Sequence, residues 1–259
     1  MTPILNLLVL LYKAFLILHL PGAFGFAIIG LTILVRLILH PFFKQQIETA
    51  KKIQDLKPHL DRLNKKHKKN PTLLQQEQLK LYQQAGINPA SGCLFMIIQL
   101  PIFLALYQTL SKFLLNGHGA KIISEINKVV FFPFLKIEAI NPWFFGFNLA
   151  LSPAAAGHWF YYLIPVITAI LQYLQAKVSM PAQEEKTVNT KDQEAKKEDN
   201  SEDFQKAMNT QMKFFLPLMF GWFSYSLPVG LSLYWNIFSV FSIIQYIKTN
   251  PKSKALGSK

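Results

Sequence analysis

The sequence predicts an all-α polytopic membrane protein with five transmembrane helices, a cytoplasmic helical hairpin and an N-terminal interfacial helix. Three observations predict this class. Hydrophobic residues make up 51% of the 259 residues, and aromatic residues make up 14%. Charged residues make up only 16% and are concentrated in a few stretches. Several apolar segments between those stretches have about the length needed to cross a bilayer core, roughly 20 residues for about 30 Å.

The formal net charge of +13 has two readings. A basic protein can bind nucleic acid, but these charges flank apolar segments, which favours attraction to anionic lipid and control of topology. No sequence-specific nucleic-acid partner is therefore expected. The single Cys93 excludes an internal disulfide bond. The first 20 residues lack a basic n-region and a small-residue cleavage site, so no cleavable signal is expected.

The chain begins with an apolar segment, residues 1–22, which is interrupted by Lys13 and ends at Pro21-Gly22. A full membrane span is one alternative. An amphipathic helix lying in the membrane interface is the preferred prediction, because the charge interrupts the apolar run. The first predicted span, residues 23–43, follows and ends near His40-Pro41, because proline breaks helical hydrogen bonding.

Residues 44–88 are predicted to form a cytoplasmic helical hairpin. The stretch holds ten basic and four acidic residues, a net charge of +6. Asn70-Pro71 divides it into two arms. In the first arm, apolar residues recur in steps of three and four, the spacing of one helical face: Ile47, Ala50, Ile53, Leu56, Leu60 and Leu63. A simple solvated, charged loop is the alternative.

The remaining boundaries follow from apolar runs and charge. They are a second span at 89–115, an extracytoplasmic loop at 116–157, a third span at 158–176, a charged cytoplasmic loop at 177–213, a short fourth span at 214–227, a fifth span at 229–247 and a basic cytoplasmic tail at 248–259. Basic segments favour the cytoplasmic side. Five spans then place the N-terminus outside and the C-terminus in the cytoplasm.

The candidate site is centred on Arg36, the one fully charged residue of the first span. Its guanidinium stays protonated, and a cation in mid-span costs about 2.5–3.5 kcal/mol on insertion scales. Arg36 could snorkel to the interface, or it could face a water-accessible cavity in the bundle. Thr32, one turn earlier, lies on the same helical face. Other polar residues that could line this cavity, or simply bond helix to helix, are Gln99, Gln172, Gln175, Tyr234 and Trp235.

Several chemistries leave no signature in this sequence. There is no P-loop and no dinucleotide-binding glycine fingerprint. The six histidines are scattered without metal-ligand spacing, and the five predicted spans contain no Asp or Glu. We therefore expect no enzymatic activity, no catalytic residues, no metal site and no cofactor. A fixed positive charge in a polar pocket would instead attract an acidic or polar peptide segment.

At the level of motifs, the sequence resembles the YidC/Oxa/Alb family of membrane protein insertases over nearly all of its length. The matching stretches are Leu31-Thr-Ile-Leu-Val-Arg-Leu-Ile-Leu-His-Pro-Phe42, Ile53-Gln-Asp-Leu-Lys-Pro58, Tyr82-Gln-Gln-Ala-Gly-Ile-Asn-Pro-Ala-Ser-Gly-Cys-Leu94, Gln99-Leu-Pro-Ile-Phe103 and Leu227-Pro-Val-Gly-Leu-Ser-Leu-Tyr-Trp235. Phe95 stands where the family usually has proline. The large periplasmic domain of many members is absent, so the chain resembles the short form.

The resemblance implies a hydrophilic groove that is open to the cytoplasm and to lipid, with Arg36 as its positive charge. Thr32 and the Tyr234-Trp235 pair match family positions near the substrate path, whereas Gln172 and Gln175 rest on polarity alone. The resemblance further implies an insertase and chaperone for nascent membrane proteins that releases their spans into the lipid bilayer without nucleotide hydrolysis. A prokaryotic plasma membrane is the expected location.

The sequence leaves several points open. A Sec-type translocon and the ribosome remain open as partners. The clients and the oligomeric state remain open as well. Two other functions are alternatives: a small channel or transporter subunit with a cationic pore, and a purely structural assembly factor that holds spans together.

Overall fold

A computed structural model describes residues 2–67, 70–87, 104–105, 107–111, 120–179 and 214–249 of the chain. These residues are mainly helical. The helices of the N-terminal half are α1 (Thr2–Ile17), α2 (Ala23–Ile38), α3 (His40–Lys66) and α4 (Pro71–Gln84). Those that follow are α6 (Ala120–Val129), α7 (Pro153–Ala156), α8 (Leu163–Ser179), the helical residues 214–226 and α10 (Val229–Thr249). Short 3₁₀ turns occupy Pro133–Leu135 and Trp159–Tyr162.

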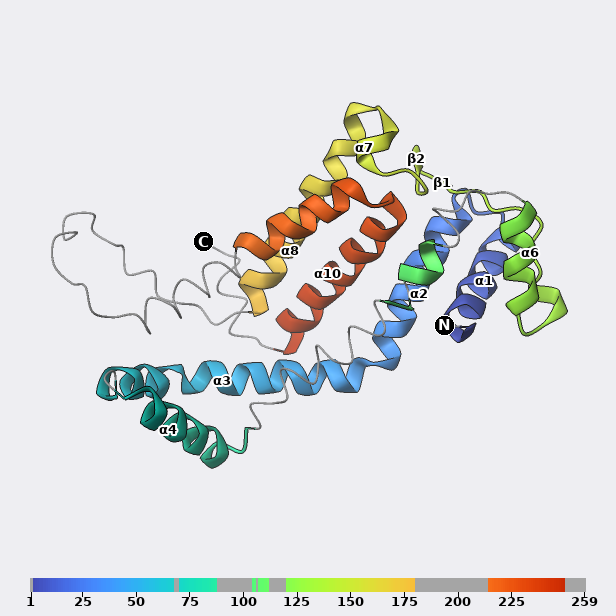
Figure 1. Ribbon diagram of the computed structural model, residues 1–259. Coiled ribbons are helices and arrows are strands. Elements are labelled where there is room, and N and C mark those ends of the chain that lie inside the picture. The colour runs from blue at the N-terminus through green and yellow to red at the C-terminus, as the bar shows by residue number, and fades with distance from the viewer. Residues whose placement is uncertain are drawn as a thin grey trace.

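Four helices lie side by side in the order α8, α10, α2, α1 (Figure 1). α10 is the central helix, since it packs against α8 on one side and α2 on the other. The helix of residues 214–226 joins this group through Gly221, whose position for a Cβ atom lies 3.2 Å from the Ala169 side chain of α8. A glycine there lets the two helices approach closely.

By length and composition, one described helix could cross a membrane alone, namely α10. α2 and α3 pass the same test together, but they are bent by 66° at the break between them, and α1 is a shorter apolar helix. The predicted all-α class agrees with the helical structure. The count of five spans stays a prediction, and the second predicted span, residues 89–115, lies mostly outside the described residues.

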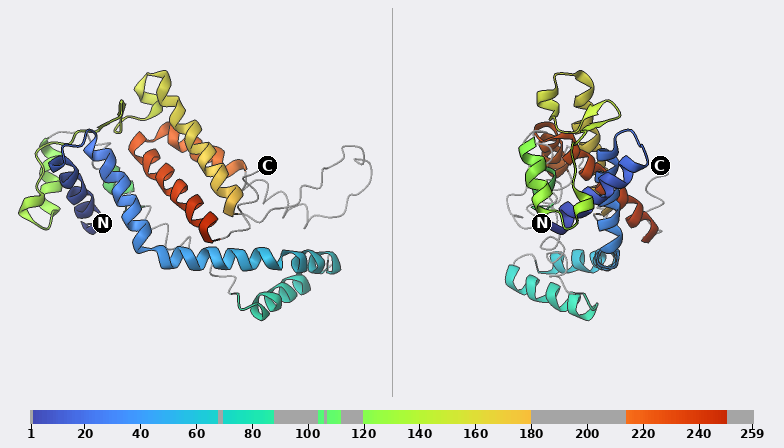
Figure 2. Two further views of the ribbon diagram at one scale, coloured as in Figure 1. Left: turned by 180° about the vertical axis from the view of Figure 1, so that it is seen from behind. Right: turned by 90° about the vertical axis from the view of Figure 1, so that its right-hand side faces the viewer.

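The bend between α2 and α3 falls at Leu39. Pro41, at the start of α3, has no backbone N–H with which to continue the hydrogen bonding of α2, so a break here is expected. The Leu39 N–H still donates to the Val35 carbonyl at 3.0 Å and closes the last turn of α2. As a result, α3 leaves the bundle sideways and crosses beneath α2 and α10 (Figures 1 and 2).

The helices α3 and α4 pack against each other as a hairpin. Asn70 caps α4, because its Oδ1 accepts a hydrogen bond from the Leu73 N–H at 3.1 Å. Gln78 donates to Asn64 Oδ1 at 2.9 Å and joins the two arms. On the exposed side of α4, Lys80 lies 2.9 Å from Glu77 and holds the pKa of that carboxyl below its usual value.

α1 packs along α2, and the segment that follows α6 packs against α1. Asn6 is buried in this contact: its side chain donates to the Val129 carbonyl at 3.1 Å and accepts from the Phe131 N–H at 2.6 Å. The Tyr12 hydroxyl accepts from the Asn141 N–H at 3.1 Å. The interfacial position of residues 1–22 stays a prediction, whereas their helical packing against α2 is a structural finding.

Within the predicted loop 116–157, a two-stranded antiparallel hairpin covers one end of the bundle. Its strands are β1 (Trp143–Phe144) and β2 (Phe147–Asn148). Phe145 and Gly146 both have positive φ angles, 45° and 86°, as the two central residues of a type I′ hairpin turn require. The loop that follows accepts hydrogen bonds from the start of α10. The Val229 N–H donates to Leu151 O, and the Gly230 N–H donates to Leu149 O, both at 2.9 Å.

Candidate functional site

Arg36 lies in the last turn of α2, where α2, α3 and α10 meet. Its side chain is only 3% exposed. The guanidinium carbon is 4.0 Å from the centre of the Phe43 ring of α3 and 3.7 Å from that of the Phe238 ring of α10. Desolvated cation–π contacts of this kind contribute about 2 kcal/mol. The charge therefore lies over two aromatic rings from different helices, whose planes are nearly perpendicular to each other.

The same guanidinium makes two hydrogen bonds to α10. Nη2 donates to the Phe238 carbonyl oxygen at 3.1 Å and to the Ser242 hydroxyl. Arg36 Nε is buried and has no hydrogen-bond partner among the described residues. We call Phe43, Phe238 and Ser242 the Arg36 clamp. All the polar groups of the clamp are neutral, and no acidic side chain pairs with Arg36 among the described residues.

Thr32 lies one turn before Arg36 on α2 and is 1% exposed. Its hydroxyl donates to the Ile28 carbonyl of its own helix at 2.7 Å. Such a bond satisfies the hydroxyl donor locally. Thr32 thus adds a polar, satisfied group to the buried face of α2 that carries Arg36.

Tyr234 and Trp235 are both buried on α10 but pack in different directions. The Tyr234 ring lies 6.0 Å from the Phe238 ring, one turn along α10 and next to the Arg36 clamp. The Trp235 ring meets the Phe220 ring edge-on at 5.2 Å, toward the helix of residues 214–226. Tyr234 is therefore beside the Arg36 clamp, and Trp235 belongs to the neighbouring helix contact.

Two of the three predicted glutamines lie on α8 rather than on the helices that surround Arg36. Gln172 and Gln175 are half-buried on α8, which is separated from α2 by α10 (Figure 1). Gln175 Oε1 is buried without a hydrogen-bond partner in the described part of the chain. Gln99 lies outside the described residues. The assignment of these three residues to a substrate groove stays a prediction.

A chain of buried hydroxyls connects three helices and was not predicted from the sequence. Thr168 of α8 and Ser224 lie 3.1 Å apart, and Ser224 and Ser232 of α10 lie 2.7 Å apart. All three residues are completely buried. The sequence gives no specific signal for these hydroxyl contacts, because isolated Ser and Thr residues are common on apolar helices.

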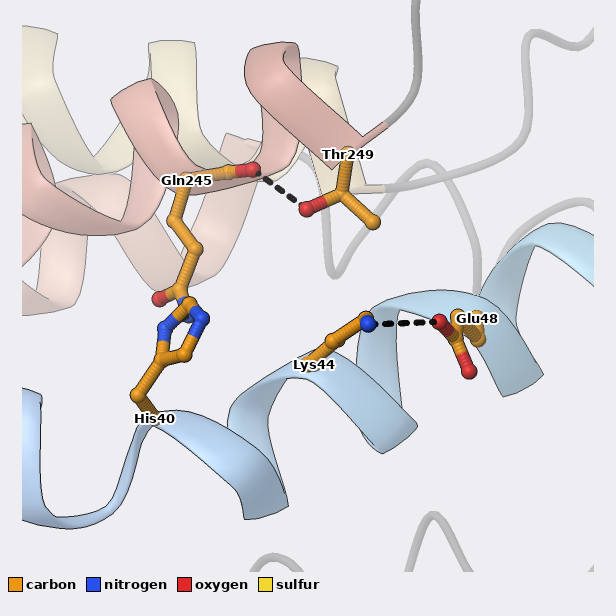
Figure 3. A network of polar contacts seen from close by, with 5 residues as sticks. All are labelled: His40, Lys44, Glu48, Gln245 and Thr249. Atoms are coloured by element: carbon orange, nitrogen blue, oxygen red, sulfur yellow. Dashed lines mark hydrogen bonds and ion pairs between the residues drawn. The ribbon is translucent and has the colours of Figure 1, made fainter.

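A second polar contact joins the first turn of α3 to the last turns of α10 (Figure 3). His40 Nδ1 and Gln245 Nε2 share a hydrogen bond of 2.8 Å. Thr249 donates to the Gln245 backbone carbonyl at 2.9 Å, and Lys44 pairs with Glu48 at 3.9 Å. With Phe43 and Ile47, which are buried, this contact attaches the hairpin to the bundle at its base.

A separate hollow lies on the segment that contains α6, away from the residues predicted to form the groove. It is an open depression with a volume of about 440 Å³. Its lining residues are Ile123, Ser124, Asn127, Lys128, Lys136 and Glu138. Within the described ranges, no three His, Cys, Asp or Glu side chains lie together as metal ligands.

The structure thus defines a class: a helical bundle with a buried arginine at the base of a charged hairpin. A family model described as "60Kd inner membrane protein" matches residues 16–255. The chain therefore belongs to the 60Kd inner membrane protein family. Relatives named YidC and ALBINO3 match the chain as well, which confirms the resemblance drawn from the motifs.

Three relatives illustrate the similarity. "Inner membrane protein ALBINO3, chloroplastic" of Arabidopsis thaliana is 32% identical over 237 residues, which are 88% of this chain and 47% of the relative. "Membrane protein insertase YidC" of Treponema denticola is 30% identical over 233 residues, 89% of this chain and 34% of the relative. "Membrane protein insertase YidC 1" of Listeria monocytogenes is also 30% identical, over 88% of this chain and 64% of the relative. The chain spans about half the length of the chloroplast relatives that it matches.

Proposed function

We propose that this protein is a membrane protein insertase that receives nascent membrane proteins beside Arg36 and releases their apolar spans into lipid without nucleotide hydrolysis. Two kinds of support exist. Relatives over most of this chain are named membrane protein insertases. The observation that carries the proposal is the buried cation, which lies at the junction of α2, α3 and α10.

Exposed apolar side chains support a membrane environment. On α8 they recur in steps of three and four along one face, the spacing of a lipid-facing stripe: Leu163, Val166, Ile167, Ile170 and Leu174. The helix of residues 214–226 also exposes large apolar side chains: Phe214, Phe215, Leu218, Trp222 and Phe223. Exposure of apolar surface to water costs about 25 cal/mol per Å², so these side chains favour contact with lipid.

The proposed topology has five spans in a prokaryotic plasma membrane, with the N-terminus outside and the C-terminus in the cytoplasm. The basic hairpin, whose described part is α3 and α4, lies on the cytoplasmic side in this arrangement. The helix of residues 214–226 is about 20 Å long at 1.5 Å per residue. A span this short favours local thinning of the bilayer, which shortens the path for a polar segment.

The mechanism that we propose has three steps. The hairpin first receives the substrate at the cytoplasmic face. A short acidic or polar segment of the substrate then moves beside Arg36, where opposite charges attract strongly because the dielectric is low. Finally the apolar span of the substrate leaves sideways into lipid, driven by hydrophobic transfer. The membrane potential adds about 2.3 kcal/mol per charge per 100 mV to outward movement of an acidic segment.

A channel or transporter subunit with a cationic pore is the alternative function. In the structure, rings of Phe43 and Phe238 cover the guanidinium of Arg36. This closed arrangement disfavours continuous ion conduction past the charge. A Sec-type translocon and the ribosome are further partners that the proposal admits but does not need.

The test uses purified protein in liposomes and a single-span substrate with an acidic outer tail. We expect Arg36→Ala to lower the insertion rate at least tenfold, because the tail loses its counter-charge. Arg36→Lys, the matched control, keeps a cation and is expected to keep most of the activity. Normal insertion by the alanine variant would contradict the proposed role of Arg36. Ion flux without insertion would favour the channel.

A further inference from the structure

The Arg36 clamp joins the candidate site to the hairpin. Phe43 belongs to α3, whereas Phe238 and Ser242 belong to α10, and all three contact the guanidinium of α2. Beyond its first turns, α3 packs mainly against α4, its partner in the hairpin. The position of the hairpin is therefore set at its base, next to Arg36.

We propose that Phe43, Phe238 and Ser242 are positioning residues that hold Arg36 in a closed state, and that an acidic substrate segment displaces them and thereby releases the hairpin from α10. This inference rests on the proposed function, because it concerns how the same cation meets its substrate. It adds a control step: occupation of the site changes the position of the element that receives the next substrate.

The hydrogen bonds of Arg36 support the displacement of the clamp by a carboxylate. A carboxylate binds an arginine most firmly through two parallel N–H···O bonds. Nε and Nη2 form one such edge of the guanidinium. Nε is buried and has no partner among the described residues, while Nη2 donates to the Phe238 carbonyl and to Ser242. Half of the edge is therefore unused, and the other half is bound by neutral acceptors.

Energetics then favour exchange of these acceptors for a carboxylate. Charge-assisted hydrogen bonds are roughly twice as strong as neutral ones. A carboxylate that uses both Nε and Nη2 takes the place of the Ser242 hydroxyl. It also draws the guanidinium away from the Phe43 and Phe238 rings, whose centres lie 4.0 Å and 3.7 Å from its central carbon.

The packing at the base of the hairpin supports its release from α10. Phe43 and Ile47 are the buried apolar residues at the start of α3, and His40 shares a hydrogen bond with Gln245 of α10 (Figure 3). When the guanidinium leaves, Phe43 loses its contact with the cation, and the contact of α3 with α10 rests on fewer groups. The hairpin then samples a wider range of positions relative to the bundle.

The experiment measures hairpin position in the full chain in lipid nanodiscs. Spin labels at the exposed residues Gln76 and Ala154, with Cys93 replaced by Ser, report the distance between hairpin and bundle. The probe is a single-span peptide with an acidic tail, compared with the same peptide carrying Asn in place of Asp. We expect the acidic peptide alone to broaden or shift the distance distribution.

Variants of the Arg36 clamp test whether its residues hold Arg36 in place or only contribute to packing. Phe43→Leu and Ser242→Ala are each expected to broaden the distribution without peptide and to bind the acidic peptide three- to tenfold more tightly, because Arg36 is freed. Ser242→Thr keeps the hydroxyl and is expected to behave like the wild type. Phe42→Leu is the matched control, since Phe42 is exposed next to Phe43.

Wild-type distances and affinities in both Phe43→Leu and Ser242→Ala would overturn the inference, as would an acidic peptide that binds without moving the hairpin. In either case, loss of insertion in Arg36→Ala would still support the proposed function. Normal insertion by Arg36→Ala would instead remove the proposed role of Arg36 and this inference with it.

Discussion

At the scale of single residues, the central feature is a cation that is buried without an acidic partner in the described part of the chain. Arg36 remains charged because a guanidinium does not lose its proton at accessible pH. Its immediate partners are two aromatic rings, a carbonyl and a hydroxyl. These groups partly replace hydration but do not neutralise the charge. If the proposed function holds, an anionic substrate group adds favourable energy that these neutral partners do not supply.

The sequence predicts Arg36 and Thr32 as site residues because a charge and a hydroxyl are conspicuous in an apolar run. It does not predict Phe43, because a phenylalanine after a proline gives no signal of contact with a charge. Ser242 has a weak sequence signal, because it lies eight residues after Tyr234, on the same side of a helix. The role of Phe238 depends on how α2 and α10 pack, which no local pattern shows.

The buried hydroxyl chain allows a prediction at this scale. Ser224→Ala removes the middle hydroxyl and leaves Thr168 and Ser232 without their shared partner. We expect the free energy of unfolding in lipid bicelles to fall by about 0.5–1.5 kcal/mol. Ser226→Ala, two residues further on and exposed, serves as the control and should leave the stability unchanged. Equal stability of both variants would mean that the hydroxyl chain contributes nothing.

At the scale of elements, the helical hairpin shows what periodicity can predict. The apolar spacing of residues 44–88 predicts two helical arms, and Asn70-Pro71 predicts a break between them. In the structure α4 begins at Pro71, with Asn70 as its cap. The proline signal at Pro41 also coincides with a break, but the new helix starts at once and keeps the chain helical. The direction of α3 after the 66° bend depends on its contacts with α10 and is not encoded locally.

Two glycines of α2 allow a matched prediction about this element. A Cβ atom on Gly25 would lie 2.2–2.7 Å from the Phe144 ring of β1, whereas one on Gly30 would meet nothing closer than 3.5 Å. Gly25→Ala should therefore destabilise the fold by about 1–3 kcal/mol through overpacking. Gly30→Ala should be neutral or stabilise it by up to about 1 kcal/mol, because alanine favours helices.

The measurement for both glycine variants is denaturant unfolding in the same detergent, with the wild type in parallel. A Gly25→Ala protein as stable as wild type would show that the β1 hairpin does not press against α2 as the structure has it.

At the scale of the whole molecule, the order α8, α10, α2, α1 puts the charged junction inside and leaves apolar faces outside. The sequence predicts apolar helices and basic flanks, and therefore a membrane protein. It does not predict that the segment after α6 packs along α1 through Asn6 and Tyr12, because those contacts join residues more than 120 positions apart. Composition alone indicates only a mixed, aromatic-rich loop there.

The fold and the proposed function meet at one point, the pairing of Arg36 with an acidic group of the substrate. In the proposed mechanism, the hairpin, the exposed apolar faces and the short helix of residues 214–226 each favour transfer into lipid. Only the charge of Arg36 distinguishes a substrate segment that carries an acidic group from one that does not. The proposed function therefore requires a coupling energy between Arg36 and one acidic residue of the substrate.

A double-mutant cycle measures that coupling most directly. Insertion rates into liposomes are compared for wild type and Arg36→Ala, each with a substrate tail carrying one Asp or the corresponding Asn. We expect that Asp→Asn slows insertion about tenfold or more with wild type and has little effect with Arg36→Ala, a coupling of about 1.4 kcal/mol or more. Equal effects of Asp→Asn in the two proteins would show that Arg36 does not receive the acidic group, and would contradict the account.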